Sequence, residues 1–130
     1  MGHDIEITVR LAGIDAPEGA TRKRIKIQPF SNEARDFLSA LILNRAVDVR
    51  GHGTDRYNRV LAVVFIDGLN VNKALLHAGL AETWRGNAPK NLDLDTFWHV
   101  EDEAKQKGRG MWRLGPNYIS PAMWRKTAGR

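Results

Sequence analysis

The alternation of apolar and polar residues predicts a small set of strands. Residues 5–11 alternate between apolar and polar side chains, which is the period of a half-buried strand. Residues 60–66 are apolar on both faces, which is typical of a strand at the centre of a sheet. Residues 46–50 predict a further strand that is followed by a turn at 51–55, and residues 80–84 predict a short extended segment.

Three helices are predicted from apolar residues that recur every three or four positions. The first follows Ser31, whose hydroxyl suits a helix N-cap. The second covers residues 71–78, with Asn70 as its cap and Gly79 just after its end, where a left-handed backbone is needed. The third covers residues 95–107. Short strands mixed with helices in this order favour an α+β fold with a small, strongly curved sheet.

Composition and charge narrow the classes of function. The 130 residues are the length of one domain, and they carry a net charge of +5. A basic balance favours a polyanionic partner such as nucleic acid, although a basic protein without such a partner fits it as well. The absence of cysteine excludes disulfides and zinc–thiolate sites. No apolar run approaches the length of a membrane span, and the tail at residues 113–130 is predicted to be irregular and basic.

The candidate chemistry begins with two acids that follow the first predicted strand. Asp15 and Glu18 lie three residues apart in a turn stiffened by Pro17. Their carboxylates offer the hard oxygen atoms that Ca²⁺ or Mg²⁺ prefers, and the backbone carbonyl of Ala16 adds a further oxygen. A carboxylate beside a metal also suits the role of a base that deprotonates water. Acids that only form a solvated turn are the alternative reading of this short motif.

Two arginines complete the candidate site. Arg10 lies at the end of the first predicted strand, and Arg59 enters the most apolar strand, where a buried charge needs a partner or a ligand. A guanidinium group binds two phosphate oxygens at once and keeps its charge at any working pH. A structural pair between Asp55 and Arg59 is the competing interpretation. Arg56 and Tyr57 suit contact with a terminal phosphate or stacking on a base.

Five ordered segments together resemble the staphylococcal nuclease (thermonuclease) family. They are VRLAGIDAPE at 9–18, QPFSNEAR at 28–35, TDRYNRVLA at 54–62, VNKALLHAGLA at 71–81 and GRGMW at 108–112. The resemblance implies an OB-fold barrel decorated with three helices. It also implies Ca²⁺-dependent hydrolysis of DNA and RNA, single-stranded or frayed, to products with 3′-phosphates.

The resemblance implies roles for individual residues of this chain. They are Asp15 and the Ala16 carbonyl as metal ligands, Glu18 as general base, Arg10 and Arg59 as the arginines that hold the reacting phosphate, and Arg56 and Tyr57 as contacts to the far phosphate of the nucleotide. Catalysis of this kind depends on stabilising the charge that develops on phosphoryl oxygens in the transition state.

The chain departs from the family pattern at its start. Family members carry two earlier strands with an Asp-Gly-Asp segment that supplies a principal metal ligand, and no such segment precedes Arg10 here. We therefore expect the N-terminal strands of the barrel to be missing or supplied by another chain. We also expect Ca²⁺ to bind weakly, activity to be weak or absent, and the exposed strand edges to pair in a homodimer.

Two other functions are weighed against the nuclease. A non-catalytic module that binds nucleic acid retains the basic cleft without turnover, and the missing aspartate favours it. A protein-interaction domain is disfavoured because Glu18, Arg10 and Arg59 are all retained. The compartment is left open, with export an expectation only if an N-terminal segment is removed.

Overall fold

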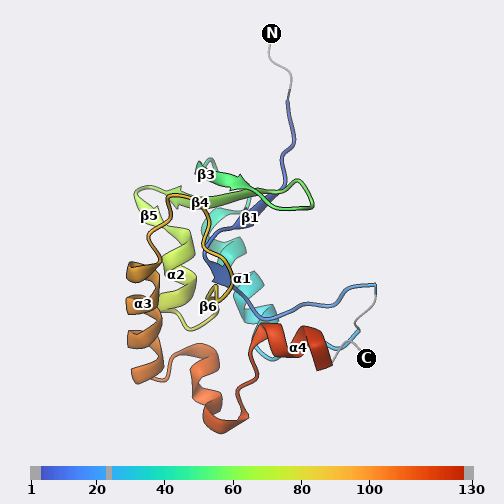
Figure 1. The fold of residues 1–130 in the computed structure, drawn as a ribbon, viewed down its shortest axis with the longest axis vertical. Coiled ribbons are helices and arrows are strands. Elements are labelled where there is room, and N and C mark those ends of the chain that lie inside the picture. Colours follow the sequence, from blue (N-terminus) through green and yellow to red (C-terminus); the bar gives the residue numbers. More distant parts are fainter. Residues whose placement is uncertain (1–3, 23–24, 128–130) are drawn as a thin grey trace.

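The computed structural model describes residues 4–22 and 25–127 of the chain. Helices and short strands are mixed along it, as Figure 1 shows. In chain order the elements are β1 (Val9–Leu11), β2 (Ile14–Asp15), α1 (Ser31–Ile42), β3 (Asp48–Thr54), β4 (Val60–Ile66), β5 (Leu69–Asn70), α2 (Val71–His77), β6 (Glu82–Thr83), α3 (Leu94–Gln106), the 3₁₀ segment η1 (Gly110–Asn117) and α4 (Pro121–Thr127). The predicted α+β class is confirmed.

Strand β4 lies at the centre of the main sheet. It pairs in parallel with β1 and antiparallel with β3, and β5 pairs with its last residues. Strands β2 and β6 form a separate antiparallel pair. The sheets fit an OB-like arrangement, but in the described ranges they do not close into the barrel that the resemblance implied. The central position that the sequence predicted for residues 60–66 is confirmed, because β4 lies between β1 and β3.

Two strand predictions were wrong in their boundaries. The first strand covers Val9–Leu11 rather than residues 5–11, and Ile5 and Ile7 are exposed. The Val60 amide still donates to the Thr8 carbonyl at 2.9 Å, but among the described residues no strand pairs with residues 5–7, so the start of the alternating pattern lacks a neighbour to support it. Strand β3 runs through the predicted turn to Thr54, because Gly51 pairs with Ala62 and the chain reverses only after Thr54.

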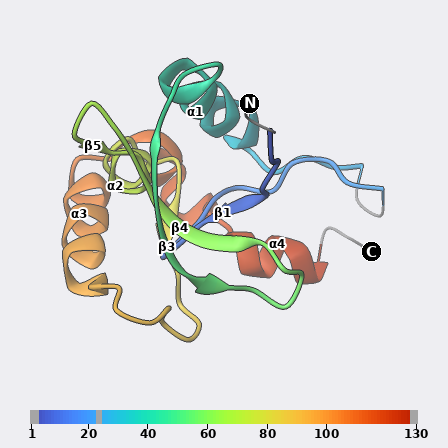
Figure 2. The same cartoon turned by 90° about the horizontal axis from the view of Figure 1, so that it is seen from above.

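The helices pack on the sheet and on one another, with α2 between α1 and α3 (Figure 2). The core contains Leu76 and Phe97 at almost no exposure. Asn70 caps α2 as predicted, because its side chain accepts a hydrogen bond from the Lys73 amide. The N-cap predicted for α1 was wrong, since Phe30 occupies that position and Ser31 is the first helical residue.

The tail was predicted to be irregular, and this was wrong for its described part. The 3₁₀ segment η1 and helix α4 occupy most of residues 113–127, whereas residues 128–130 lie outside the described residues. Met111 and Pro121 are buried and fasten this segment to the rest of the fold. Among the described residues no helix is both long and apolar enough to cross a membrane.

Candidate active site

The turn between β1 and β2 sets the position of the acid loop, which we define as residues 15–18. Gly13 has a φ of +76°, and a Cβ there would lie 2.7 Å from the Phe97 ring, so only glycine fits. The Ala12 amide donates to the Ala62 carbonyl at 2.8 Å, which holds the turn against β4. Asp15 then pairs with Glu82 across β2 and β6. The acid loop therefore leaves the sheet at a fixed point.

Gln28 fixes the other end of the acid loop. The Glu18 amide donates to Gln28 Oε1 at 3.0 Å, and the Gln28 amide donates to the Glu18 carbonyl at 2.8 Å. The Gln28 side chain is almost fully buried, and its Nε2 donates to the Ile119 carbonyl at 2.7 Å. One buried amide thus ties the backbone of the proposed general base to the C-terminal segment.

The two acid side chains converge on one guanidinium group. Arg125 Nη1 lies 2.9 Å from Asp15 Oδ1 and 2.5 Å from Glu18 Oε1, while Nη2 lies 2.9 Å from Asp15 Oδ2. The side chains of Asp15 and Glu18 are 11% and 21% exposed. Hydrogen bonding to Asp15, followed by that to Glu18, raises the pKa of Arg125 above its ordinary value, although burial opposes the rise. Asp15 and Glu18 therefore share a space the size of one cation.

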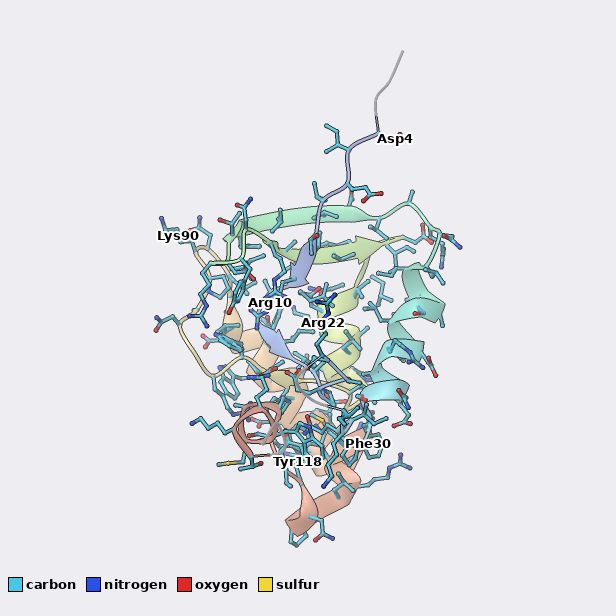
Figure 3. The ribbon with its side chains drawn as sticks, turned by 90° about the vertical axis from the view of Figure 1, so that its right-hand side faces the viewer. Asp4, Arg10, Arg22, Phe30, Lys90 and Tyr118 are labelled. Atoms are coloured by element: carbon cyan, nitrogen blue, oxygen red, sulfur yellow. The ribbon has the colours of Figure 1, made fainter. Side chains whose placement is uncertain are left out.

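Arg10 lies on β1, and Arg59 immediately precedes the neighbouring strand β4. Arg10 pairs with Leu61 in the parallel register of β1 and β4. Because side chains alternate along a strand, Arg59, two residues before Leu61, falls on the same face as Arg10. The guanidinium of Arg10 stacks at 4.7 Å from the centre of the Trp84 ring, and Figure 3 shows its place on β1. The sheet thus brings the two arginines to one surface.

A local carboxylate holds Arg59. Arg59 Nε donates to Asp55 Oδ2 at 2.7 Å, and the amides of Tyr57 and Arg59 donate to Asp55 Oδ1 at 2.9 and 3.0 Å. Burial acts to raise the pKa of Asp55, but the hydrogen bonds from Arg59 and Tyr57 outweigh it, so this pKa lies below its ordinary value. The structural pair that the sequence left open is present. Of the three guanidinium nitrogens of Arg59, only Nε forms a hydrogen bond with another described residue.

Arg56 and Tyr57 lie on the exposed turn beside Arg59. Tyr57 is 67% exposed, and the guanidinium of Arg56 lies 5.2 Å from the centre of its ring. In the described part of the chain, no hydrogen bond or ion pair joins this turn, or Arg10, to the acid loop. The structure thus forms two groups: an acid pair with Arg125, and an arginine surface with its aromatic neighbours.

A network below the acid loop was missed by the sequence analysis. Glu101 is fully buried on α3, accepts a hydrogen bond from the Thr83 amide at 2.9 Å and pairs with Arg85 at 3.3 Å. Arg85 also pairs with Glu82, whose Oε1 accepts from the Tyr118 hydroxyl at 2.6 Å. Burial raises the pKa of Glu82. The signal in the sequence was the acid of Glu101 on the apolar face of its helix.

The acid loop fits a hard cation in part. Two carboxylates already converge on a positively charged nitrogen, and hard cations complete their shell with backbone carbonyls, waters or phosphate oxygens. Over residues 4–22 and 25–127, however, no three acidic or histidine side chains gather into a set that could hold a metal ion. Asp15, Glu18 and the Ala16 carbonyl are therefore the candidate protein ligands of the cation. Water and substrate oxygens would fill the other positions of its coordination shell.

The family follows from the comparison of the whole chain with known proteins. A model described as staphylococcal nuclease homologue matches residues 8–114. The chain belongs to this family. The resemblance drawn from the five sequence segments is thereby confirmed, and the matched range contains the acid loop and both arginines but ends before α4.

The curated relatives of this staphylococcal nuclease homologue carry endonuclease names. A protein of Podospora anserina named probable endonuclease LCL3 is 35% identical over 89% of this chain and 46% of its own length. An uncharacterized endonuclease of Haemophilus influenzae is 36% identical over 92% of this chain and 61% of its own length. The chain spans about half the length of the curated relatives it matches.

Proposed function

We propose that this chain is a nuclease of weak activity that hydrolyses phosphodiester bonds of DNA and RNA with the help of Ca²⁺. The observation that carries the proposal is the convergence of Asp15 and Glu18 on one cationic nitrogen, at 2.9 and 2.5 Å. Two acids that formed only a solvated turn would have no need to meet at one cation. The endonuclease names of the relatives and the shared face of Arg10 and Arg59 support the same activity.

The proposed chemistry assigns the proton transfer to Glu18. Its carboxylate takes a proton from water as the water oxygen attacks phosphorus. The bond from phosphorus to the 5′ oxygen breaks, the 5′ oxygen takes a proton from solvent, and the phosphate stays on the 3′ side. Arg10 and Arg59 bind the non-bridging oxygens and stabilise the charge that grows on them. In this account the products carry 3′-phosphates.

Asp15 and the Ala16 carbonyl are the groups proposed to hold Ca²⁺. When bound, the cation draws negative charge from the phosphoryl group and makes phosphorus more open to attack. With one side-chain carboxylate and one backbone carbonyl as protein ligands, we expect weak binding, because Ca²⁺ sites lose affinity as ligand charge falls.

Single-stranded or frayed nucleic acid is the proposed substrate. The exposed Tyr57 ring, with the Arg56 guanidinium 5.2 Å from its centre, offers a base-stacking face beside a positive charge. Unpaired bases stack on such a face, whereas paired bases are already stacked in the duplex. Net charge of +5 adds attraction for the phosphate backbone.

The direct test is hydrolysis of a single-stranded oligonucleotide by the chain with added Ca²⁺ and, in parallel, with EGTA. We expect cleavage only with Ca²⁺, to fragments whose 3′ ends are phosphorylated. Equal rates in EGTA would reject the metal dependence, and the absence of cleavage at any Ca²⁺ concentration would reject the nuclease.

A non-catalytic module that binds nucleic acid is the second candidate. It is favoured by one observation, that Arg125 engages both acids. For this function the chain binds oligonucleotides without cleaving them, and the affinity falls steeply with salt because bound counterions are released. Filter binding at several salt concentrations, read together with the cleavage assay, separates the two functions.

A homodimer through exposed strand edges is also proposed. In the described ranges β3 pairs only with β4, and most of its residues are exposed. Ile5 and Ile7 add apolar surface that nothing described covers. An open edge beside apolar surface favours pairing with another chain. A sizing column with light scattering is expected to give the mass of a dimer, and a single monomeric peak at all concentrations would reject it.

A further inference from the structure

Helix α4 supplies the one cation that the described residues place between the two acids. It covers Pro121–Thr127, beyond the end of the family match at residue 114. The contacts of Arg125 with Asp15 and Glu18 therefore come from outside the part of the chain that the family model matches. This feature is a property of this chain's own C-terminal segment.

The contact uses the acid atoms that a metal would need. Both carboxylate oxygens of Asp15 accept from Arg125, each at 2.9 Å, and Glu18 Oε1 lies 2.5 Å from the same guanidinium. An oxygen that accepts a hydrogen bond from a guanidinium is not free to coordinate a cation in the same direction. Repulsion between a divalent cation and the positive charge of Arg125 adds to this steric exclusion. Arg125 and Ca²⁺ thus compete for one place.

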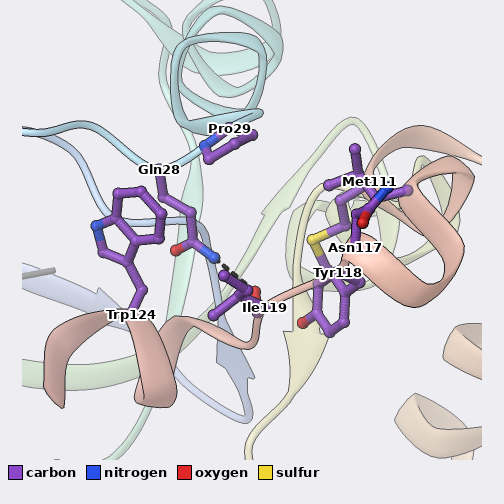
Figure 4. Close-up of a pocket in the computed structure, with 8 residues that line it drawn as sticks. Gln28, Pro29, Met111, Asn117, Tyr118, Ile119 and Trp124 are labelled. Carbon is purple, nitrogen blue, oxygen red and sulfur yellow. Dashed lines mark hydrogen bonds between the residues drawn. The ribbon is translucent and has the colours of Figure 1, made fainter. Parts of the chain in front are cut away.

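Two features of α4 favour reversible docking. The helix is seven residues long, too short to be stable without its packing. Trp124 covers a small apolar pocket with Gln28 and Ile119, as Figure 4 shows. Its indole Nε1 is nevertheless buried without a hydrogen-bond partner among the described residues, which costs stability in the docked state. The helix is held by the ion pairs of Arg125, by this small apolar contact and by the buried Pro121 at its first position.

We propose that Arg125 is a built-in competitor of the metal, so that α4 closes the acid loop when Ca²⁺ is absent and leaves it when Ca²⁺ binds. The inference rests on the proposed function, because it assigns Ca²⁺ to Asp15. The proposal is an exchange of cations: the Arg125 guanidinium offsets one of the two negative charges of Asp15 and Glu18 until a divalent cation replaces it. The exchange keeps Glu18 engaged, and therefore unable to accept a proton from water, until the metal is present.

The test is the affinity for Ca²⁺ alone, measured by titration calorimetry without nucleic acid. The variants are Arg125→Gln and the matched control Lys126→Gln, which removes the same charge from the neighbouring, exposed position of α4. We expect Arg125→Gln to lower the Kd for Ca²⁺ about tenfold, because a charge-assisted contact no longer opposes binding. Lys126→Gln stays within about twofold of the parent, because salt screens an exposed charge.

Three outcomes overturn the inference. The first is a Kd for Ca²⁺ that is unchanged in Arg125→Gln, and the second is a Kd that is higher than that of the parent. The third is an equal fall of the Kd in both variants, which would indicate an effect of net charge rather than of the Arg125 contact. The cleavage assay keeps the two proposals apart. Ca²⁺-dependent cleavage with an unchanged Kd rejects the role of Arg125 and leaves the nuclease standing, whereas tighter Ca²⁺ binding without cleavage supports the competition and rejects the nuclease.

A second measurement uses the parent chain and so does not depend on a variant that folds. Hydrogen exchange of the amides in residues 122–127 of α4 is followed with EDTA and with saturating Ca²⁺. We expect exchange at least several-fold faster with Ca²⁺, because the helix loses its ionic contact. Amides in β4 serve as the internal reference and keep their rates. Equal or slower exchange of α4 in Ca²⁺ overturns the proposal.

Discussion

The acid loop and the arginine surface reach their positions in opposite ways. Arg59 is held by Asp55, four positions before it, in a turn built from consecutive residues. Asp15 and Glu18 are held by Arg125, at separations of 110 and 107 residues. A local pair forms as soon as its turn forms, whereas a distant pair forms only when two remote segments dock. The ion pair of the arginine surface therefore forms locally, whereas the ion pairs of the acid loop form only when the C-terminal helix α4 is docked.

The substitution Glu18→Gln tests the acid side and has the largest expected effect. Because glutamine has no basic oxygen for the proton of water, cleavage of single-stranded DNA in Ca²⁺ falls about 10²–10⁴-fold. Initial rates measured across Ca²⁺ concentrations check this. Glu33→Gln, on the exposed first turn of α1, is the control and retains the parent rate. A Glu18→Gln variant as fast as its parent would remove the general base from the acid loop.

The substitution Arg59→Lys tests the arginine side. Lysine keeps the charge but loses the planar pair of donors, so we expect kcat to fall about 10²-fold. The local pair with Asp55 predicts that the fold is kept, which circular dichroism checks. A rise in KM with kcat unchanged would indicate that Arg59 only binds substrate and does not act in the transition state.

The substitution Asn72→Ala breaks the link between the two regions. The buried Asn72 side chain donates to the Ala12 and Ala62 carbonyls at 2.9 and 3.0 Å and accepts from the Val64 amide at 3.1 Å. Its loss leaves buried polar groups without partners, so the free energy of unfolding falls by about 2–4 kcal/mol. Urea unfolding measures it. Asn32→Ala, exposed on α1, changes stability by less than about 0.5 kcal/mol, and equal effects would refute the link.

The substitution Asp55→Asn tests the local ion pair of the arginine surface and has the smallest expected effect. The pKa of Asp55 lies below its ordinary value of 3.8 in the folded chain, because hydrogen bonds from Arg59 and Tyr57 outweigh the burial that opposes them. Such a carboxylate adds stability above pH 3.8, and this stability is lost as the pH falls through the lowered pKa.

Urea midpoints of the parent and of Asp55→Asn, measured from pH 7 to pH 2.5, check this prediction. The variant is less stable at pH 7, and the difference from its parent shrinks as the pH falls through the acid range. A difference that is constant with pH would assign the effect to packing and not to the charge of Asp55.

The parts of the fold that the sequence predicted are those with strong local signals. The run at residues 60–66 is apolar on both faces, and this strand is central. Asn70 and Gly79 bracket α2 as predicted, because a cap and a left-handed residue act within a few positions. The boundaries of β1 and β3 were wrong because strand length depends on the neighbouring strand, which local patterns do not contain.

The candidate site also has one contact that the local sequence predicted and one that it did not. The pairing of Asp55 with Arg59 was visible in the spacing of the two residues, since a carboxylate four positions before an arginine reaches it across a turn. The partner of Asp15 was not visible, because Arg125 lies in a tail whose composition predicted no structure. Helix α4 has only seven residues, too few for a stable helix in isolation, so its formation depends on packing, which includes the pocket shared with Gln28 and Ile119.

By itself the sequence determined the family, the chemical groups of the site and the elements whose patterns are local, because these depend on residue identity and near neighbours. The tertiary structure alone decided that the two acids meet at the guanidinium of Arg125 and that this group comes from the last helix of the described residues. The physical reason is range: an ion pair between remote segments arises from the docking of whole elements, and no short stretch of sequence encodes that docking.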